Sequence, residues 1–187
     1  MAKVKLAPAV EAIHGHVGNM LFKTVASGEI VGKMPDRTGV APTPSQLAQR
    51  EKFGSAVLYG KAVVADPVNK QIYEELGAAR GVPAFAVAVG DFLNPPTIDT
   101  IDLSSYTGKA AEKIRIRASD DVAVEAVAVT IRKQNGDVIE TGAAVKGAAG
   151  RWEYTTTQAL EVGEAVAIEV VATDLPGNTG TKNQQRP

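Results

Sequence analysis

Apolar residues follow two different periods along the 187-residue chain, and the change falls at Asn94-Pro95-Pro96. Before this segment, apolar positions recur every three or four residues, which is typical of helices. After it, they alternate with polar positions, which is typical of strands with one buried face. Because a proline pair cannot continue a helix, we place a domain boundary here. Residues 1–95 are then a hairpin-and-helix domain, and residues 96–187 a β-sandwich with a polar tail.

Residues before the proline pair predict a β-hairpin followed by two or three helices. Extended segments on either side of Ser27-Gly28 indicate the hairpin, whose modest apolar content would leave it marginally stable alone. Thr43-Pro44-Ser45-Gln46 has the features of a helix start, with Thr as the N-cap and Pro at the first helical position. The large apolar residues of this first helix are Leu47, Phe53, Val57 and Leu58.

Two further segments favour helices. Asp66-Pro67 starts a second helix, which carries Val68 and Ile72 four residues apart and which we expect to end at Gly77. Residues 82–93 suit a short third helix, but their Val and Ala content leaves a strand open.

Five to seven short strands are predicted after the proline pair, with turn signals every 8–12 residues. Residues 166–172 give the longest alternation of apolar and polar positions, and Asn135-Gly136-Asp137 is a strong tight-turn signal. Trp152 and Tyr154 alternate with charged residues, which favours a place in the core over a ligand platform. The pattern predicts an antiparallel sandwich, and the whole chain is then of the α+β class.

Two segments carry a resemblance to a known family. One is Ile116-Arg117-Ala118-Ser119-Asp120-Asp121, followed by Val127-Ala128-Val129. The other is Leu160-Glu161-Val162-Gly163, followed by residues 170–178, which end in Ala-Thr-Asp-Leu-Pro-Gly-Asn. Both resemble the bacterial immunoglobulin-like domains of adhesins, phage virion proteins and surface proteins. The resemblance covers about residues 96–183, and it implies an immunoglobulin-like (Ig-like) sandwich with a binding, spacer or structural role and no catalytic residues.

The N-terminal part carries a second resemblance. Gly15-His16-Val17-Gly18 and the segment from Pro44 to Phe53 are similar to the opening of uncharacterised bacterial and phage-associated proteins. That similarity implies an assembly context and no assigned activity.

Composition and charge argue against several classes of function. The chain has no cysteine, which removes disulfide scaffolds, thiol nucleophiles, zinc fingers and iron–sulfur clusters. Twenty Lys and Arg against 21 Asp and Glu give a net charge of −1, which argues against a nucleic-acid binder. No nucleophile–base motif or phosphate-binding loop is present, so we expect no enzymatic activity and no cofactor apart from the calcium considered below.

Hydropathy predicts no membrane partner. The longest mostly apolar run, residues 82–89, is far shorter than the about 20 residues that span a bilayer. The N-terminal apolar stretch is interrupted by Lys5, Pro8 and Glu11, so it does not resemble a secretory signal. We expect a protein made in the cytoplasm without a signal peptide, and acting in a virion or another extracellular assembly.

Four oxygen-bearing residues are candidate metal ligands: Asp120, Asp121, Asp174 and Asn178. In an Ig-like topology, the loop after the second strand and the loop after the sixth lie at the same end, so these side chains would converge. Carboxylate and amide oxygens are the ligands that calcium prefers. The alternative is that Asp and Asn only end strands and cap turns. His14 and His16 would share one face of a strand, but they lack a recognised ligand spacing.

The sequence favours a non-enzymatic structural subunit that self-assembles into a filament, sheath or virion particle. Its partners would be copies of itself, joined by sheet-edge pairing and by exchange of terminal strands, with residues 1–10 and the polar tail 181–187 as the exchanged arms. The tail's composition predicts disorder unless a neighbour holds it. The alternative function is an adhesin-like or carbohydrate-binding Ig module that acts through loops at one end of the sandwich.

Overall fold

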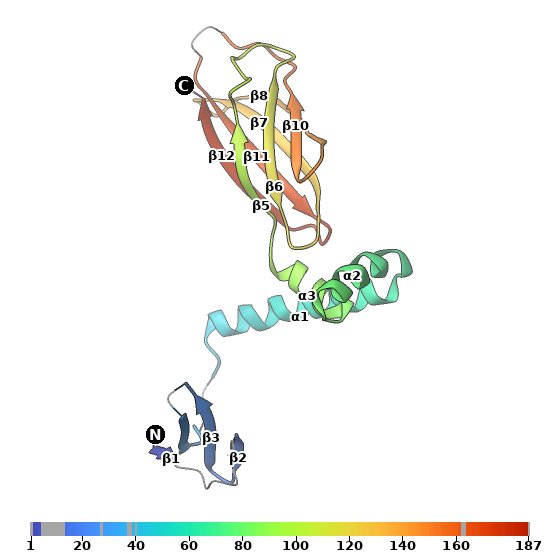
Figure 1. The fold of residues 1–187 in the computed structure, drawn as a ribbon. Coiled ribbons are helices and arrows are strands. Elements are labelled where there is room, and N and C mark those ends of the chain that lie inside the picture. Colours follow the sequence, from blue (N-terminus) through green and yellow to red (C-terminus); the bar gives the residue numbers. More distant parts are fainter. Residues whose placement is uncertain are drawn as a thin grey trace. The chain divides into compact units, whose positions relative to one another are not determined.

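The computed structural model describes residues 2–4, 14–26, 28–36, 39, 41–161 and 164–186. Contacts divide the chain into two compact units, Met1–Pro44 and Ser45–Pro187. The first unit contains a small β-sheet, and the second contains three helices and a β-sandwich (Figure 1). The change from helix to strand falls at the predicted proline pair. The helices nevertheless share a unit with the sandwich, because Val122 and Leu175 of the sandwich pack against the helix core.

The N-terminal sheet has the strand order β1-β4-β3-β2 and is antiparallel throughout. Its strands are β1 (Ala2–Val4), β2 (Gly15–Val17), β3 (Met20–Val25) and β4 (Gly28–Lys33). The predicted hairpin is β3 and β4, although Ser27 at its turn lies outside the described residues. Within residues 14–26 and 28–36, no side chain is buried. Within these residues, the sheet therefore has no buried hydrophobic core.

Three helices follow: α1 (Pro44–Ala65), α2 (Pro67–Arg80) and α3 (Ala84–Leu93). The first begins at the predicted proline, and Asp66 caps the second by accepting a hydrogen bond from the Val68 amide at 3.0 Å. The expected end of α2 at Gly77 is wrong. Gly77 is buried, and a Cβ there would come within 2.5 Å of the Val82 carbonyl oxygen. The helix instead ends at Arg80, and Gly81 caps it with a left-handed φ of 69°. Residues 84–93 are helical.

Small residues make the buried face of α1. Ala56, Gly60 and Val63 are buried, and a Cβ on Gly60 would touch Phe85 and Val89 of α3 at 3.0 Å. The large apolar side chains expected to define this helix are mostly exposed instead: Leu47, Phe53 and Leu58. Because α1 approaches α3 closely, only small side chains fit between the two helices, and the large apolar side chains of α1 are mostly exposed on its other faces. Among the described residues, no single helix is long and apolar enough to cross a membrane; α2 and α3 meet that criterion only together, with a bend of 101° between them.

Two four-stranded antiparallel sheets form the sandwich, with the orders β5-β6-β10-β9 and β12-β11-β7-β8. Immunoglobulin-type sandwiches have this strand order. The order describes the architecture and does not show membership of a protein family. The strands of the first sheet are β5 (Thr97–Asp102), β6 (Lys113–Ser119), β9 (Val145–Lys146) and β10 (Arg151–Thr155). Those of the second are β7 (Val124–Lys133), β8 (Val138–Ala143), β11 (Val166–Asp174) and β12 (Thr179–Arg186).

The core lies between the two sheets and follows the predicted alternation. On β11 the residues Val166, Ile168, Val170 and Ala172 have no exposed surface. Trp152 and Tyr154 of β10 are also buried in this core, so their predicted place is confirmed and neither is a surface platform for a ligand.

Most of the polar tail belongs to a strand of the sandwich, β12. Strand β12 pairs with β11 along its whole length. Lys182 Nζ donates to the carbonyl oxygens of Ile98 and Asp99, and Arg186 donates to the carbonyl oxygen of Thr107. The predicted disorder was wrong. Although the segment has almost no apolar residue, its backbone groups pair with β11 on one side, and the long side chains of Lys182 and Arg186 form hydrogen bonds on the other.

Gly180→Ala tests how tightly the start of β12 is packed. A Cβ at this position would overlap the carbonyl oxygen of Pro96, so the segment before β5 must move. We expect a loss of about 1–3 kcal/mol in the free energy of unfolding, measured by urea denaturation. The control is Gly54→Ala on α1, where a Cβ meets nothing within 4 Å; it should stabilise by up to about 1 kcal/mol. Equal effects of the two substitutions would contradict the close approach.

Candidate functional site

The sandwich and the helices meet at a group of buried carboxyl groups. Asp120 lies in the loop between β6 and β7, Asp174 ends β11, and Asp91 lies on the last turn of α3. One oxygen of each carboxyl group lies within 4.8 Å of the other two. We call Asp91, Asp120 and Asp174 the junction cluster.

Two of the four predicted ligands, Asp120 and Asp174, belong to this cluster, and the other two have different roles. Asn178 supports Asp174: its amide N donates to Oδ1 at 2.6 Å and its Nδ2 to Oδ2 at 2.8 Å. Asp121 faces another way, since its Oδ2 accepts a hydrogen bond from Asn94 Nδ2 at 2.7 Å and its carbonyl oxygen accepts one from Arg80. The topology therefore brings the two predicted loops together, but it separates Asp121 from the cluster.

A chain of hydrogen bonds connects the cluster to all three helices. The Tyr73 hydroxyl on α2 donates to Asp91 Oδ2 at 2.6 Å. Its own oxygen lies 2.8 Å from the Tyr59 hydroxyl on α1. Burial and the hydrogen bond to Asp91 raise the pKa of Tyr73 far above its ordinary value, so this hydroxyl stays protonated and donates. Tyr59 then donates to Tyr73.

The cluster is buried, and two of its oxygens lack a donor. Asp91 is 1% exposed and Asp174 is 1% exposed, while Asp120 is half-buried. Asp120 Oδ2 accepts hydrogen bonds from the amides of Val122 and Ala123. Asp91 Oδ1 and Asp120 Oδ1 are buried and accept no hydrogen bond from a protein donor, although the two carboxyl groups are close enough to share a proton.

These surroundings disfavour negative charge on the cluster. Burial raises the pKa of Asp91 to about 7, and the nearby Asp120 and Asp174 add to the rise while the Tyr73 hydrogen bond opposes it. Burial also raises the pKa of Asp174, against the lowering effect of its hydrogen bonds with Asn178. Three carboxyl groups so placed can hold a cation or share protons. Asp91 was not among the ligands predicted from the sequence. Its one visible signal is that it is the only charged residue within the apolar segment 84–93.

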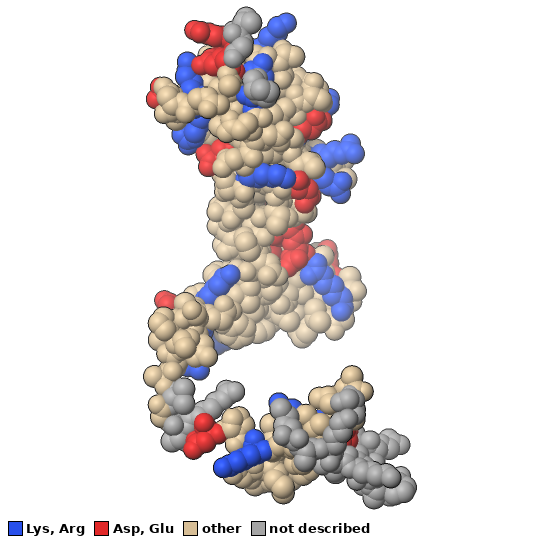
Figure 2. All heavy atoms as spheres, turned by 90° about the vertical axis from the view of Figure 1, so that its left-hand side faces the viewer, with Lys and Arg blue, Asp and Glu red and all other residues tan. Residues whose placement is uncertain are grey.

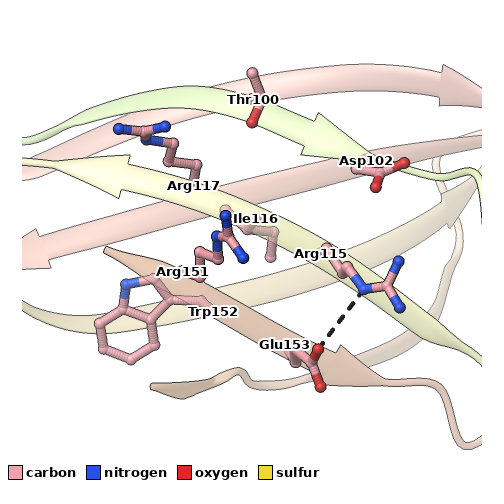
Figure 3. Close-up of a pocket in the computed structure, with 8 residues that line it drawn as sticks. All are labelled: Thr100, Asp102, Arg115, Ile116, Arg117, Arg151, Trp152 and Glu153. Carbon is pink, nitrogen blue, oxygen red and sulfur yellow. Dashed lines mark ion pairs between the residues drawn. The ribbon is translucent and has the colours of Figure 1, made fainter. Parts of the chain in front are cut away.

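A second candidate is a shallow pocket on the outer face of the first sandwich sheet (Figure 3). Arg117 and Arg151 are direct cross-strand partners there, and among the described residues none forms a hydrogen bond or ion pair with the Arg151 side chain. Arg115 pairs with Glu153 at 3.6 Å, and Arg117 pairs with Asp99 at 3.6 Å. Because acidic groups balance two of the three arginines, the pocket carries no strong field.

One face of the sandwich surface shows a similar balance. On the face in Figure 2, Lys and Arg side chains are interspersed with Asp and Glu over the sandwich. His14 and His16 are exposed at the edge of the N-terminal sheet, and the nearby Glu11 lies outside the described residues. The described surroundings of the two histidines supply no further metal ligand.

Comparisons with known proteins give structural neighbours only. No protein-family model matches the chain, no curated protein matches it, and no enzyme family is found. The chain is similar to the structure of CopC from Methylosinus trichosporium OB3b, with 16% identity, a TM-score of 0.37, and coverage of 48% of this chain and 89% of that one. It is also similar to a tetra-tandem repeat in the extending region of a large adhesion protein, with 22% identity and a TM-score of 0.35. That match covers 50% of this chain and 24% of the other.

A third neighbour is a conjugative transposon lipoprotein from Bacteroides eggerthii DSM 20697, with 15% identity and a TM-score of 0.27. The match covers 49% of this chain and 95% of the lipoprotein. These neighbours are all-β domains. Similarity at this level does not transfer a ligand, a partner or an activity to this chain.

Tyr73→Phe tests the hydrogen-bond chain. The substitution leaves Asp91 Oδ2 buried without a donor, so we expect a loss of about 1–3 kcal/mol in the free energy of unfolding. Tyr59→Phe, the matched control, removes only the outer hydroxyl of the chain and should cost less. Urea denaturation of both variants measures the difference. A larger loss for Tyr59→Phe would contradict the proposed order of donors.

Proposed function

We propose that the protein is a non-enzymatic structural subunit that self-assembles, with copies of itself as its partners. The observation that carries this proposal is the N-terminal sheet, which has four strands and no buried side chain within residues 14–26 and 28–36. Val17 and Met20 are 66% and 52% exposed. A small sheet is stable only when it buries an apolar face or packs against another element. A second copy of the chain supplies that cover.

Helix α1 offers a second apolar surface to such a copy. Leu47 and Leu58 are eleven residues apart, about three helical turns, so they share one face of the helix. That face is turned away from the buried residues Ala56, Gly60 and Val63, and Leu58 is 68% exposed. Exposed apolar patches on soluble proteins commonly mark contacts with other proteins. A net charge of −1 lets copies approach without strong repulsion.

Strand exchange would use the N-terminal strand. Strand β1 is an edge of its sheet and pairs with β4 through Ala2–Val31, Lys3–Ile30 and Val4–Glu29. These main-chain hydrogen bonds do not depend on which copy donates the strand, so β1 of one copy fits β4 of another in the same register. The predicted arm, residues 1–10, includes β1; residue 1 and residues 5–10 lie outside the described part of the chain. We place the exchange at β1 rather than at the C-terminal tail, because β1 is held by three residue pairs and β12 by eight.

Removing the arm tests the mechanism. We expect the full chain to form oligomers or polymers in light scattering and negative-stain microscopy, and deletion of residues 1–10 to abolish them. The deletion should leave the sandwich folded, since no residue of the first unit belongs to its described core. A full chain that stays monomeric at high concentration would refute self-assembly. A polymer that survives the deletion would refute strand exchange alone.

Leu58→Lys tests the helix surface. Burying a leucine contributes about 1.5–3 kcal/mol, so its loss should raise the concentration needed for association by about tenfold or more. Light scattering over a dilution series measures this shift. The matched control is Gln134→Lys, which adds the same charge at an exposed position in the turn between β7 and β8. If both variants shift association equally, the effect comes from charge, and α1 is not the contact.

A further inference from the structure

We propose that the junction cluster binds one hard divalent cation of the calcium class, which joins α3 to the sandwich. The three carboxyl groups come from three separate segments: the end of α3, the loop after β6 and the end of β11. They nevertheless place one oxygen each within 4.8 Å of the other two. Oxygens that ligate one calcium ion at 2.3–2.6 Å are separated by distances of this order.

The unpaired oxygen of Asp91 is an independent sign of a ligand. Asp91 is 1% exposed, and its Oδ1 has no hydrogen-bond donor although Tyr73 satisfies Oδ2. Asp120 Oδ1 is buried and lacks a donor in the same way. Buried carboxylate oxygens without a partner are strongly unfavourable, and native structures rarely keep them. A cation between these two oxygens would satisfy both of them.

No positive side chain neutralises the cluster. Among the described residues, no Lys or Arg forms an ion pair with Asp91, Asp120 or Asp174. Arg80, which reaches this end of the sandwich, donates to the carbonyl oxygen of Asp121 instead. Buried charges are paired with opposite charges or coordinate metals. A bound cation would supply the missing opposite charge.

The ligand atoms select the class of ion. The cluster offers carboxylate oxygens only, the chain has no cysteine, and both histidines lie in the other compact unit. Oxygen ligands suit calcium and magnesium rather than zinc or copper. Calcium accepts 6–8 ligands in flexible geometry, so three carboxylates can be completed by water that enters beside the half-buried Asp120. This inference does not depend on self-assembly.

Calcium titration of the full chain tests the site directly. The purified protein is dialysed against EDTA, and its Tm is measured at fixed protein concentration with calcium, with magnesium and with EDTA. Calcium at about a hundredfold excess over its Kd should raise the Tm by about 5–10 °C. Terbium, a calcium substitute, should show emission sensitised by tyrosine, because the Tyr73 hydroxyl lies 2.6 Å from Asp91 Oδ2.

Substitutions then locate the ion. Asp91→Asn, Asp120→Asn and Asp174→Asn should each abolish the calcium shift and the terbium emission. Asp121→Asn is the matched control: it removes a neighbouring carboxylate that faces Asn94 rather than the cluster, so the shift should remain. If Asp91→Asn does not fold, two measurements still test the site: the calcium shift of Asp120→Asn, on the exposed side of the cluster, and terbium binding by the unmodified chain.

The proposal is overturned if the Tm of the unmodified chain is the same in calcium, magnesium and EDTA and no terbium emission appears. A Tm that ignores the ions but rises between pH 8 and pH 6 would show that protons occupy the cluster instead. Loss of the calcium shift in Asp121→Asn, with the shift retained in Asp91→Asn, would place the ion elsewhere and also overturn the assignment.

Discussion

The burial of one carboxyl group, that of Asp91, constrains how the second compact unit is built. A carboxyl group with 1% exposure needs a donor, and the Tyr73 hydroxyl supplies one at 2.6 Å. That hydrogen bond joins α2 to α3, and Tyr59 extends the chain of hydrogen bonds to α1. Because Asp91 also lies beside Asp120 and Asp174, the same group determines where the helices lie on the sandwich. The packing of the helices on one another and on the sandwich thus combines this polar group with the apolar cluster of Val63, Tyr73, Val87 and Ala88.

The parts of the fold that depend on local patterns could be predicted from the sequence. Alternation along residues 166–172 defines a strand with one buried face, whatever its neighbours are. Pro44 and Asp66 mark helix starts through local geometry, and the structure has helices beginning at Pro44 and Pro67. The convergence of Asp120 and Asp174 was accessible for another reason: an immunoglobulin-type topology places both loops at one end of the sandwich.

What could not be predicted depends on contacts between distant segments. Asp91 follows a run of Ala and Val, and nothing local shows that Tyr73, eighteen residues away, would bury and satisfy it. The buried face of α1 consists of small residues such as Ala56 and Gly60, so the positions of the larger apolar side chains predicted the wrong buried face. The polar tail is ordered by backbone pairing with β11, which leaves no mark in its own composition.

The contacts of β12 with β5 have a mechanical consequence. Gly180 lies against Pro96, Lys182 reaches the carbonyl oxygens of Ile98 and Asp99, and Arg186 reaches Thr107, so the first and last strands of the sandwich run in the same direction, side by side. Tension applied between residues 96 and 186 would therefore act along both strands. It would shear their contacts all at once instead of opening them one after another. Such an arrangement resists stretching along the direction of the two strands.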